Sequence, residues 1–229
     1  MIPNQWYAIL PSKAVKPNRV TGVKRLGMDL ALFRNSGGDI CCVADQCTHR
    51  GAALSLGKVK GDCVECPFHG LQFDKTGRCR LIPANGRASA ADLGRYNVKS
   101  YPVRESSGII YLWYGEEEKM TDELPFFYED IDSTWVYSEV ADRWNSHYSR
   151  CIENQLDVVH LPFVHAATIG RGGKTLVNGP RVELVPGGLV TSANNEPDVG
   201  QTPRAAADCV IKSTYLKFLF PNIWMNHIS

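Results

Sequence analysis

The alternation of apolar and polar residues divides the chain into two parts. From residue 5 to 115, short apolar runs typical of β-strands are separated by turn-forming residues in SGGD, KTGR and SSG. The runs are QWYAIL, LALFRN, ICCVAD, LQFD, RCRLI and IIYLWY. The acidic segment GEEEKMTDELPFF, residues 115–127, follows them and is typical of a connector. We therefore predict an all-β domain over residues 1–115.

The second part, residues 116–229, contains one helical pattern among strand-like runs. A strand-like TWVYSEVA leads into DRWNSHYSRCIENQLDVVH, residues 142–160. We expect this segment to be a helix that Pro162 ends, because proline cannot continue the hydrogen-bond ladder. The later runs RVELV, GGLVTSA and CVIKSTYLKFLF predict a sheet packed against the helix. The chain as a whole is thus predicted to be of the α+β class.

Charge and composition exclude several function classes. With 25 Lys and Arg against 24 Asp and Glu, the net charge of +1 gives no field that favours nucleic acid or an anionic membrane. The apolar runs fall short of the ~20 residues of a membrane span, and MIPNQWY lacks the features of a signal peptide. We therefore expect a cytoplasmic protein whose eight cysteines are free thiols or metal ligands rather than disulfide partners.

Two of these cysteines stand close to histidines in short motifs. CTHRG supplies Cys47 and His49, and CPFHG supplies Cys66 and His69, with sixteen residues between the two pairs. A closed zinc site commonly pairs like ligands, whereas each pair here is mixed. Mixed pairs suit a [2Fe-2S] centre in which one iron takes both thiolates and the other takes both imidazoles. A structural zinc site is the alternative.

This stretch resembles the Rieske family closely, and the resemblance extends over most of the first part of the chain. Cys63 offers an alternative thiolate three residues before Cys66, in CVEC. The family pattern favours Cys66, which is followed by a proline and by His69, and Cys63 then becomes a small core residue. The resemblance thus implies that Cys47, His49, Cys66 and His69 hold a Rieske [2Fe-2S] cluster.

The helical segment holds a second group of candidate metal ligands. At about 100° per residue, Glu153, Asp157 and His160 fall on one face of the expected helix. A separate apolar face, suited to packing on the sheet, consists of Trp144, Tyr148, Ile152, Leu156 and Val159. His165 follows beyond Pro162, so the chain can turn its imidazole back toward His160. Two imidazoles and one carboxylate with open positions form the facial triad of a non-haem iron(II) oxygenase.

The stretch ENQLDVVHLPFVH resembles the catalytic signature of Rieske non-haem iron oxygenases, and its Asn-to-Asp spacing resembles the monooxygenase and O-demethylase branch. The resemblance implies a helix-grip-like catalytic domain in which His160 and His165 bind the mononuclear iron. It also implies that Asp157 bridges to His69 of a neighbouring chain in a homotrimer, where the carboxylate would orient the metal-bound imidazole. Asn154 lies near the same site and is a candidate for a weak or outer contact.

The resemblance further implies a third iron ligand, a carboxylate from a segment well downstream of the histidine pair. No matching segment occurs before residue 229. The later carboxylates Glu183, Glu196, Asp198 and Asp208 stand in no context that singles one of them out. We therefore expect the catalytic domain to be incomplete at the C-terminus of this sequence.

Both motifs indicate the oxygenase component of a Rieske monooxygenase or dioxygenase. The resemblance implies hydroxylation or oxidative demethylation of a small organic, often aromatic, substrate with O2. It implies that electrons from NAD(P)H pass through a separate reductase or ferredoxin to the cluster, and through His69 and Asp157 to the iron; the sequence has no dinucleotide fingerprint of its own. The alternatives are a Rieske ferredoxin-like electron carrier without an active iron site, and a zinc-stabilised binding module.

Overall fold

The computed structural model describes residues 1–87 and 92–228. By its internal contacts the chain separates into two compact units, Met1–Leu124 and Pro125–Ser229. The first unit contains strands and short 3-10 helices, and the second contains a sheet and two α-helices. The predicted α+β class, with an all-β unit first, is therefore confirmed. The predicted assignment of residues 1–115 and 116–229 to two domains stays a prediction.

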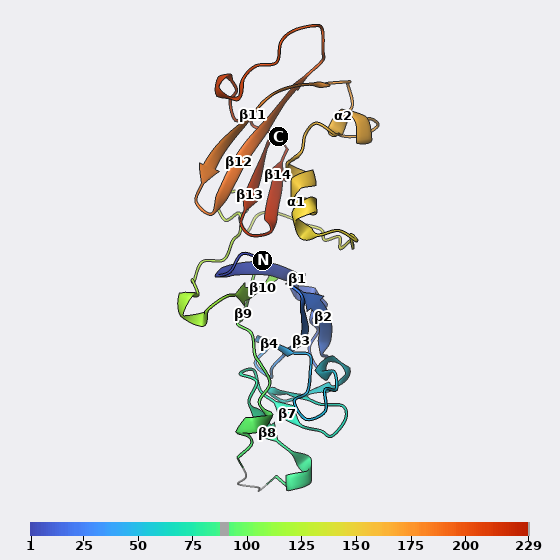
Figure 1. Ribbon diagram of the computed structural model, residues 1–229, viewed down its shortest axis with the longest axis vertical. Coiled ribbons are helices and arrows are strands. Elements are labelled where there is room, and N and C mark those ends of the chain that lie inside the picture. Colours follow the sequence, from blue (N-terminus) through green and yellow to red (C-terminus); the bar gives the residue numbers. More distant parts are fainter. Residues whose placement is uncertain (88–91, 229) are drawn as a thin grey trace. The chain divides into compact units, whose positions relative to one another are not determined.

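The described part of the first unit consists of short strands in three antiparallel sheets (Figure 1). The strands are β1 (Gln5–Pro11), β2 (Thr21–Arg25), β3 (Met28–Arg34), β4 (Ile40–Ala44), β5 (Lys58–Lys60), β6 (Cys63–Glu65), β7 (Gln72–Phe73), β8 (Cys79–Leu81), β9 (Val103–Ser106) and β10 (Ile109–Tyr114). The 3-10 helices are η1 (Ser12–Ala14), η2 (Leu54–Leu56), η3 (Pro83–Asn85), η4 (Gly94–Tyr96) and η5 (Glu117–Lys119). The sheets have the orders β1-β10-β9, β2-β3-β4 and β5-β6-β7-β8.

Two hydrophobic cores explain why the central run LALFRN forms a strand without polar alternation. Successive side chains of a strand point to opposite faces. In β3, Leu30 and Leu32 therefore pack into one core, and Ala31 and Phe33 pack into the other. The core around Ala31 and Phe33, here called the first core, also contains the two motif cysteines; the core around Leu30 and Leu32 is called the second core.

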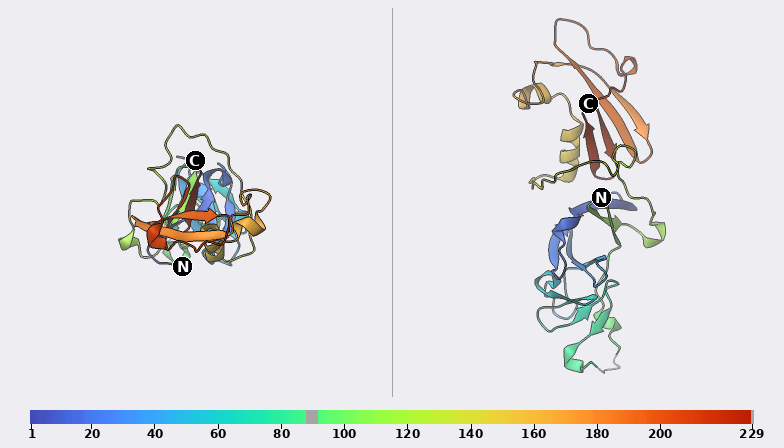
Figure 2. Two further views of the ribbon diagram at one scale, coloured as in Figure 1. Left: turned by 90° about the horizontal axis from the view of Figure 1, so that it is seen from above. Right: turned by 180° about the vertical axis from the view of Figure 1, so that it is seen from behind.

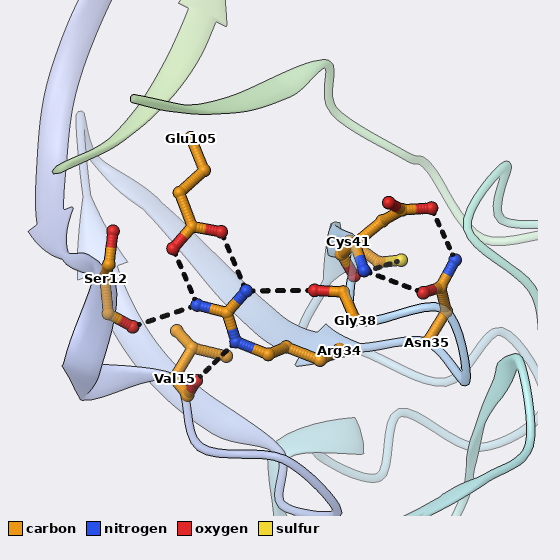
Figure 3. A network of polar contacts seen from close by, with 8 residues as sticks. Ser12, Val15, Arg34, Asn35, Gly38, Cys41 and Glu105 are labelled. Atoms are coloured by element: carbon orange, nitrogen blue, oxygen red, sulfur yellow. Dashed lines mark hydrogen bonds and ion pairs between the residues drawn. The ribbon is translucent and has the colours of Figure 1, made fainter. Parts of the chain in front are cut away.

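Arg34, at the end of β3, joins three separate segments of the first unit (Figure 3). Its Nη1 and Nη2 atoms form a two-point ion pair with the Glu105 carboxylate on β9, at 2.7 and 2.8 Å. The same guanidinium donates to the carbonyl oxygens of Val15 at 2.8 Å, Gly38 at 3.0 Å and Ser12 at 3.1 Å. One side chain thus satisfies backbone groups that strands leave unpaired where they end.

The second unit contains one antiparallel sheet of order β11-β12-β13-β14, and Figures 1 and 2 show these strands side by side. Its elements are α1 (Tyr148–Leu156), α2 (Leu161–Val164), β11 (Leu176–Val185), β12 (Gly188–Glu196), η6 (Ala206–Asp208), β13 (Tyr215–Leu219) and β14 (Ile223–His227). Asp130 fastens the segment before the helices to this sheet, because its carboxylate accepts hydrogen bonds from Tyr215 Oη and Lys217 Nζ, both at 2.8 Å.

The helix expected over residues 142–160 is wrong in its length. It begins only after His147, whose Nδ1 accepts a hydrogen bond from the Ser149 N–H and so caps α1. It ends at Leu156 because Asp157 has an extended backbone and its carboxylate accepts a hydrogen bond from the Val159 N–H at 2.8 Å. Such local bonds from Asp compete with the helical ladder.

The shorter helix changes the predicted faces. Glu153 lies on α1 and pairs with Arg150, whereas Asp157 and His160 lie outside α1, so the three predicted polar residues do not share one helix face. Pro162 does not end α1 either. It lies in the first turn of α2, where its missing N–H needs no partner. Across the described residues, no helix is both long and apolar enough to cross a membrane.

The strand expected over TWVYSEVA is also wrong, since residues 134–141 form no strand. Val136 and Val140 are 96% and 90% exposed there. A strand needs a neighbour to receive its backbone hydrogen bonds, and apolar alternation alone does not supply one. Within the predicted apolar helix face, Trp144 and Val159 are likewise half exposed.

Candidate metal centres

The first cysteine motif forms a tight loop that is closed on both sides of the cysteine. The Cys47 N–H donates to the Ala52 carbonyl at 2.8 Å, and the Gly51 N–H donates to the Cys47 carbonyl at 2.8 Å. These two bonds fix the backbone of the cysteine while the residues between Cys47 and Gly51 remain on the surface. His49 is one of these exposed residues.

The second motif repeats the same backbone arrangement. The Cys66 N–H donates to the Leu71 carbonyl at 2.8 Å, and the Gly70 N–H donates to the Cys66 carbonyl at 3.1 Å. Gly51 and Gly70 stand at the same place in the two loops and have φ angles of 73° and 72°. This left-handed conformation favours glycine over other residues, so the glycines of CTHRG and CPFHG are needed for the shape of the loops.

The two loops bring their side chains together, with the cysteines buried and the histidines exposed. Cys47 and Cys66 are each only 2% exposed, and their side chains are neighbours in the first core. His49 and His69 are exposed, and their ring centroids are 4.6 Å apart. Two buried sulfur ligands beneath two exposed imidazoles fit a [2Fe-2S] cluster with an inner iron on the thiolates and an outer iron on the histidines.

The surroundings of Cys47 affect the pKa of its thiol, and a bound metal would change its protonation state. Burial raises the pKa of the Cys47 thiol, and the adjoining Cys66 raises it further, whereas the backbone N–H groups of His49 and Arg50 lower it. The thiol is thus protonated at neutral pH when no cation is near. A coordinated cation deprotonates such a thiol outright, which fits these residues as metal ligands.

Cys63 lies apart from this group. It is half buried on β6 and lines a hollow together with Asp62 and Asp74. Burial and the charge of Asp74 raise the pKa of its thiol. The structure therefore brings Cys66, and not Cys63, to Cys47. Of the remaining cysteines, four are buried and one is half buried: Cys41, Cys42, Cys79 and Cys209, and Cys151.

The second unit holds the other pair of predicted ligands. The rings of His160 and His165 have centroids 5.3 Å apart. The two residues flank the single turn of α2, and the His165 N–H donates to the Leu161 carbonyl at 3.0 Å. Gly170 supports this turn, because its N–H donates to the His165 carbonyl and a side chain there would collide with the Leu161 carbonyl. The five-residue spacing thus places both imidazoles together through a helical turn.

Asp157 orients the first of these histidines. Its Oδ2 atom lies 3.0 Å from His160 Nδ1. The hydrogen bond from the Val159 N–H lowers the pKa of the Asp157 carboxyl, burial opposes this shift, and His160 lowers the pKa further. In the neutral tautomer whose Nδ1–H donates to this carboxylate, the lone pair of Nε2 is free to ligate a metal. Neutral Nε2 is the form of histidine that ligates metals, and such carboxylate partners fix the tautomer.

The structure assigns no third ligand to this histidine pair. Within residues 1–87 and 92–228, no three His, Cys, Asp or Glu side chains are grouped so that they could hold one metal ion. Three of the four carboxylates considered from the sequence have other contacts: Glu183 pairs with Arg181, Glu196 pairs with Arg204, and Asp198 accepts from the Gly200 N–H. Asn154 is exposed on α1 and makes no side-chain hydrogen bond to the described residues.

Two contacts at these centres escape sequence reasoning. Asn195 on β12 donates from Nδ2 to the Val158 carbonyl at 3.2 Å and so fastens the segment between Asp157 and His160 to the sheet. Its Oδ1 atom is buried without a hydrogen-bond partner among the described residues. In the first unit, Tyr96 contacts the His49 loop. Neither residue belongs to a motif, and both contacts join positions far apart in sequence, so no local signal marks them.

Two family models match the chain in tandem. The Rieske [2Fe-2S] domain matches residues 5–102, and the vanillate O-demethylase oxygenase C-terminal domain matches residues 144–227. The first match contains all four ligands predicted for the cluster, and the second contains Asn154, Asp157 and both histidines of the second pair.

Curated relatives match about three quarters of the chain. Cholesterol 7-desaturase nvd of Xenopus laevis is 36% identical over 174 residues, which are 74% of this chain and 37% of that protein. The oxygenase component of chloroacetanilide N-alkylformylase from Rhizorhabdus wittichii (strain DC-6 / KACC 16600) is 34% identical over 173 residues, which are 73% of this chain and 48% of that protein. The chain thus spans less than half the length of these relatives.

Two solved structures of oxygenases have a fold similar to that of this chain. A crystal structure of dicamba monooxygenase bound to dicamba superposes with a TM-score of 0.74 at 25% identity, over 86% of this chain and 59% of that chain. NdmA of Pseudomonas putida CBB5 superposes with a TM-score of 0.78 at 22% identity, over 96% of this chain and 62% of that chain, and shows the shared fold. From the tandem domains and these relatives, the chain belongs to the alpha subunits of the Rieske non-haem iron oxygenases, with a C-terminal domain of the vanillate O-demethylase type.

Proposed function

We propose that the chain forms the cluster-binding part and part of the iron-binding region of an oxygenase component that acts as a monooxygenase or demethylase. The observation that carries this proposal is the presence of both ligand sets in one chain. The thiols of Cys47 and Cys66 meet beneath a pair of histidine rings, and a second histidine pair with a carboxylate partner lies in the other unit. Neither a zinc-stabilised binding module nor a simple electron carrier requires the second ligand set.

The residues of the first centre divide into two pairs. Cys47 and Cys66 would hold the inner iron of the cluster, and His49 and His69 would hold the outer iron. The two glycine-containing loops supply the backbone that fixes these four residues, and the first core keeps water from the sulfur atoms. When bound, the cluster supplies single electrons, and an Fe(II) ion at the other centre supplies the reduction of dioxygen.

The residues of the second centre would hold and orient the iron. His160 and His165 provide two imidazoles on one side, which is the histidine part of a facial triad. Asp157 holds the proton of His160 Nδ1 and so presents Nε2 as the ligand atom. Asn154 would act as an outer contact, since it is exposed on the same segment. The third ligand, a carboxylate in the family pattern, has no assignment among the described residues.

The wider system follows from the family. We infer a homotrimer in which Asp157 meets His69 of a neighbouring chain, and a separate reductase or ferredoxin that delivers electrons from NAD(P)H. The names of relatives as components of systems support such a partner, as in the iron-sulfur subunit of the toluene-4-sulfonate monooxygenase system of Comamonas testosteroni. All eight cysteines are free, which supports a reducing, cytoplasmic location.

The proposed substrate is a small organic molecule, often aromatic in this family. Names of relatives include a toluene-4-sulfonate monooxygenase and a chloroacetanilide N-alkylformylase, but also a cholesterol 7-desaturase and a 4beta-methylsterol monooxygenase. The first two names support aromatic substrates, and the other two support a sterol. Hydroxylation and oxidative demethylation are the proposed reactions.

Replacing His160 with alanine tests the assignment of the iron site. We expect the variant to lose substrate oxidation and one iron per chain but to keep the visible and EPR spectra of the Rieske cluster, because the two centres use different side chains. The matched control is His147→Asn, which keeps an N-capping side chain for α1 and leaves both ligand sets intact. Full turnover by the His160→Ala variant would overturn the proposed iron site.

A further inference from the structure

Positive and negative residues are unevenly distributed along the chain, although the net charge is close to zero. Residues 5–102, which contain the cluster ligands, carry fifteen Lys and Arg but only seven Asp and Glu, an excess of eight positive charges. The rest of the chain is correspondingly acidic, since the whole sequence has a net charge of only +1. A local excess of this size creates a field that extends to about a Debye length, ~8 to 10 Å at ordinary ionic strength.

Part of this positive charge stands beside His49. Arg50 follows the histidine directly and is exposed. Arg95 lies over the ring of Tyr96, with its Cζ atom 4.8 Å from the ring centroid, and its Nη2 donates to Tyr96 Oη at 2.8 Å. The Tyr96 ring in turn meets the His49 ring edge-on, with centroids 6.5 Å apart. We call Arg50, Arg95, Tyr96 and His49 the His49 surface.

The His49 surface is held in place by the ligand loop itself. Thr48 Oγ1, next to the histidine, donates to the Tyr96 carbonyl at 2.5 Å. Neither Arg50 nor Arg95 forms an ion pair with the described residues. The acidic residue nearest to Arg95 in sequence is Asp92, and its carboxylate accepts a hydrogen bond from the Gly94 N–H. Two cations without acidic partners therefore flank a candidate cluster ligand on a rigid support.

We propose that the His49 surface is the docking site of the electron donor and that this donor is a protein with an acidic contact face. The inference rests on the proposed function, in which His69 faces the iron centre of a neighbouring chain and leaves His49 as the ligand on the entry side. Each encounter transfers one electron: the donor is oxidised by one electron and the cluster centre is reduced by one, and no covalent bond forms or breaks.

Physical reasons favour an acidic protein over other partners. Opposite charges on two proteins speed their diffusional encounter by about 10-fold to 1000-fold at low salt. Arg and Tyr are the residues that interfaces enrich, because they combine a polar group with a large, stiff contact area. Both are present here within contact of the ligand loop. A small neutral or cationic reductant would gain nothing from the arrangement.

Stopped-flow reduction of the purified holoprotein tests the proposal with one defined probe, the hydroquinone of a small acidic flavodoxin. Its semiquinone absorbance reports each electron transferred. We expect Arg50→Glu and Arg95→Glu each to lower the second-order rate constant by about 10-fold at low salt. We also expect the wild-type rate to fall with ionic strength and both variants to lose much of this dependence.

The control is Lys24→Glu, which makes the same change of charge on β2, where the neighbouring Val23 packs against the second core rather than the first. It should react at nearly the wild-type rate. Arg50 has no side-chain partner among the described residues, so its variant stays informative if Arg95→Glu fails to fold. Reduction potentials are measured for all variants so that a changed driving force is recognised.

The outcomes separate the surface from the function. Equal rates for Arg50→Glu, Lys24→Glu and wild type, in proteins that all show the Rieske spectrum, would overturn the docking surface and leave the proposed function intact. Protein without acid-labile sulfide would overturn the proposed function itself. Slower reduction of the cluster in Arg50→Glu, with an unchanged reduction potential and a normal rate for Lys24→Glu, would establish the His49 surface as the docking site.

Discussion

Arg34 contributes more to the first unit than a residue at a strand end ordinarily does. Its side chain is only 15% exposed, and it contacts one carboxylate and three backbone carbonyls from three different segments. Hydrogen bonds with a charged donor or acceptor are stronger than hydrogen bonds between neutral groups. The planar guanidinium also binds the carboxylate at two points. A lysine could not make the same set of contacts.

We expect Arg34→Lys to lower the free energy of unfolding of the first unit by about 2 kcal/mol, because several charged hydrogen bonds are lost together. Urea denaturation followed by fluorescence measures the change. Arg104→Lys serves as control, since its partner Asp122 has a side chain that is 97% exposed and surface pairs contribute little. Equal effects of the two substitutions would show that the Arg34 contacts add no stability of their own.

Glu105 gives the same contact a pH dependence. The hydrogen bond from Arg34 lowers the pKa of Glu105 below its ordinary value of 4.5, with burial opposing the shift. A carboxylate with a lowered folded-state pKa contributes stability above its unfolded pKa and loses that contribution as the pH falls through the folded value. Urea unfolding from about pH 3 to 7 should therefore show a difference between wild type and Glu105→Gln that is constant above about pH 5 and shrinks toward acid. A difference that grows toward acid pH would contradict this assignment.

At the scale of elements, the two ligand loops are the features that the motifs predict best. Each places an exposed histidine two or three residues after a buried cysteine and returns through a glycine with a left-handed backbone. The loops thus need both their ligands and their glycines. Gly70 is the more constrained of the two, because a Cβ atom there would lie 3.0 Å from Pro83 Cγ.

We expect Gly70→Ala to reduce acid-labile sulfide per chain severalfold and to destabilise the first unit by about 1 to 2 kcal/mol. Gly61→Ala is the matched control: its φ is 58°, so the backbone strain is similar, but no atom lies within 4 Å of the added Cβ and the position is outside both loops. The control should lose comparable stability and keep its sulfide. Full sulfide in Gly70→Ala would contradict the role given to the loop.

The sequence predicted elements well where periodicity and burial agree. The strands around QWYAIL, LALFRN and IIYLWY formed as expected, because continuous apolar runs must be buried on both faces. The short polar strands β5 and β9 carry no such signal. The helix over residues 142–160 was predicted too long because helical periodicity does not register the hydrogen bond that Asp157 makes with the Val159 N–H. The contact of Asn195 with Val158 depends on the fold and on no local pattern.

At the scale of the whole molecule, each compact unit contains one of the two ligand sets. The four predicted cluster ligands lie within the first unit and the second histidine pair lies within the other. Motif spacing was enough to choose the side chains that the structure brings together, because ligand loops are local. It could not supply the third iron ligand, which the family pattern places far from the histidines in sequence. The chain spans only 37% of the cholesterol 7-desaturase that it matches.

The central claim is that this chain holds a Rieske cluster and a separate iron. The most direct measurement is the content of iron, zinc and acid-labile sulfide per chain in protein purified without oxygen. The account predicts near three irons and two sulfides, since the cluster contributes two of each and the His160 and His165 pair contributes one further iron. Two irons with two sulfides would contradict the iron site and leave an electron carrier. Zinc without sulfide would contradict both centres.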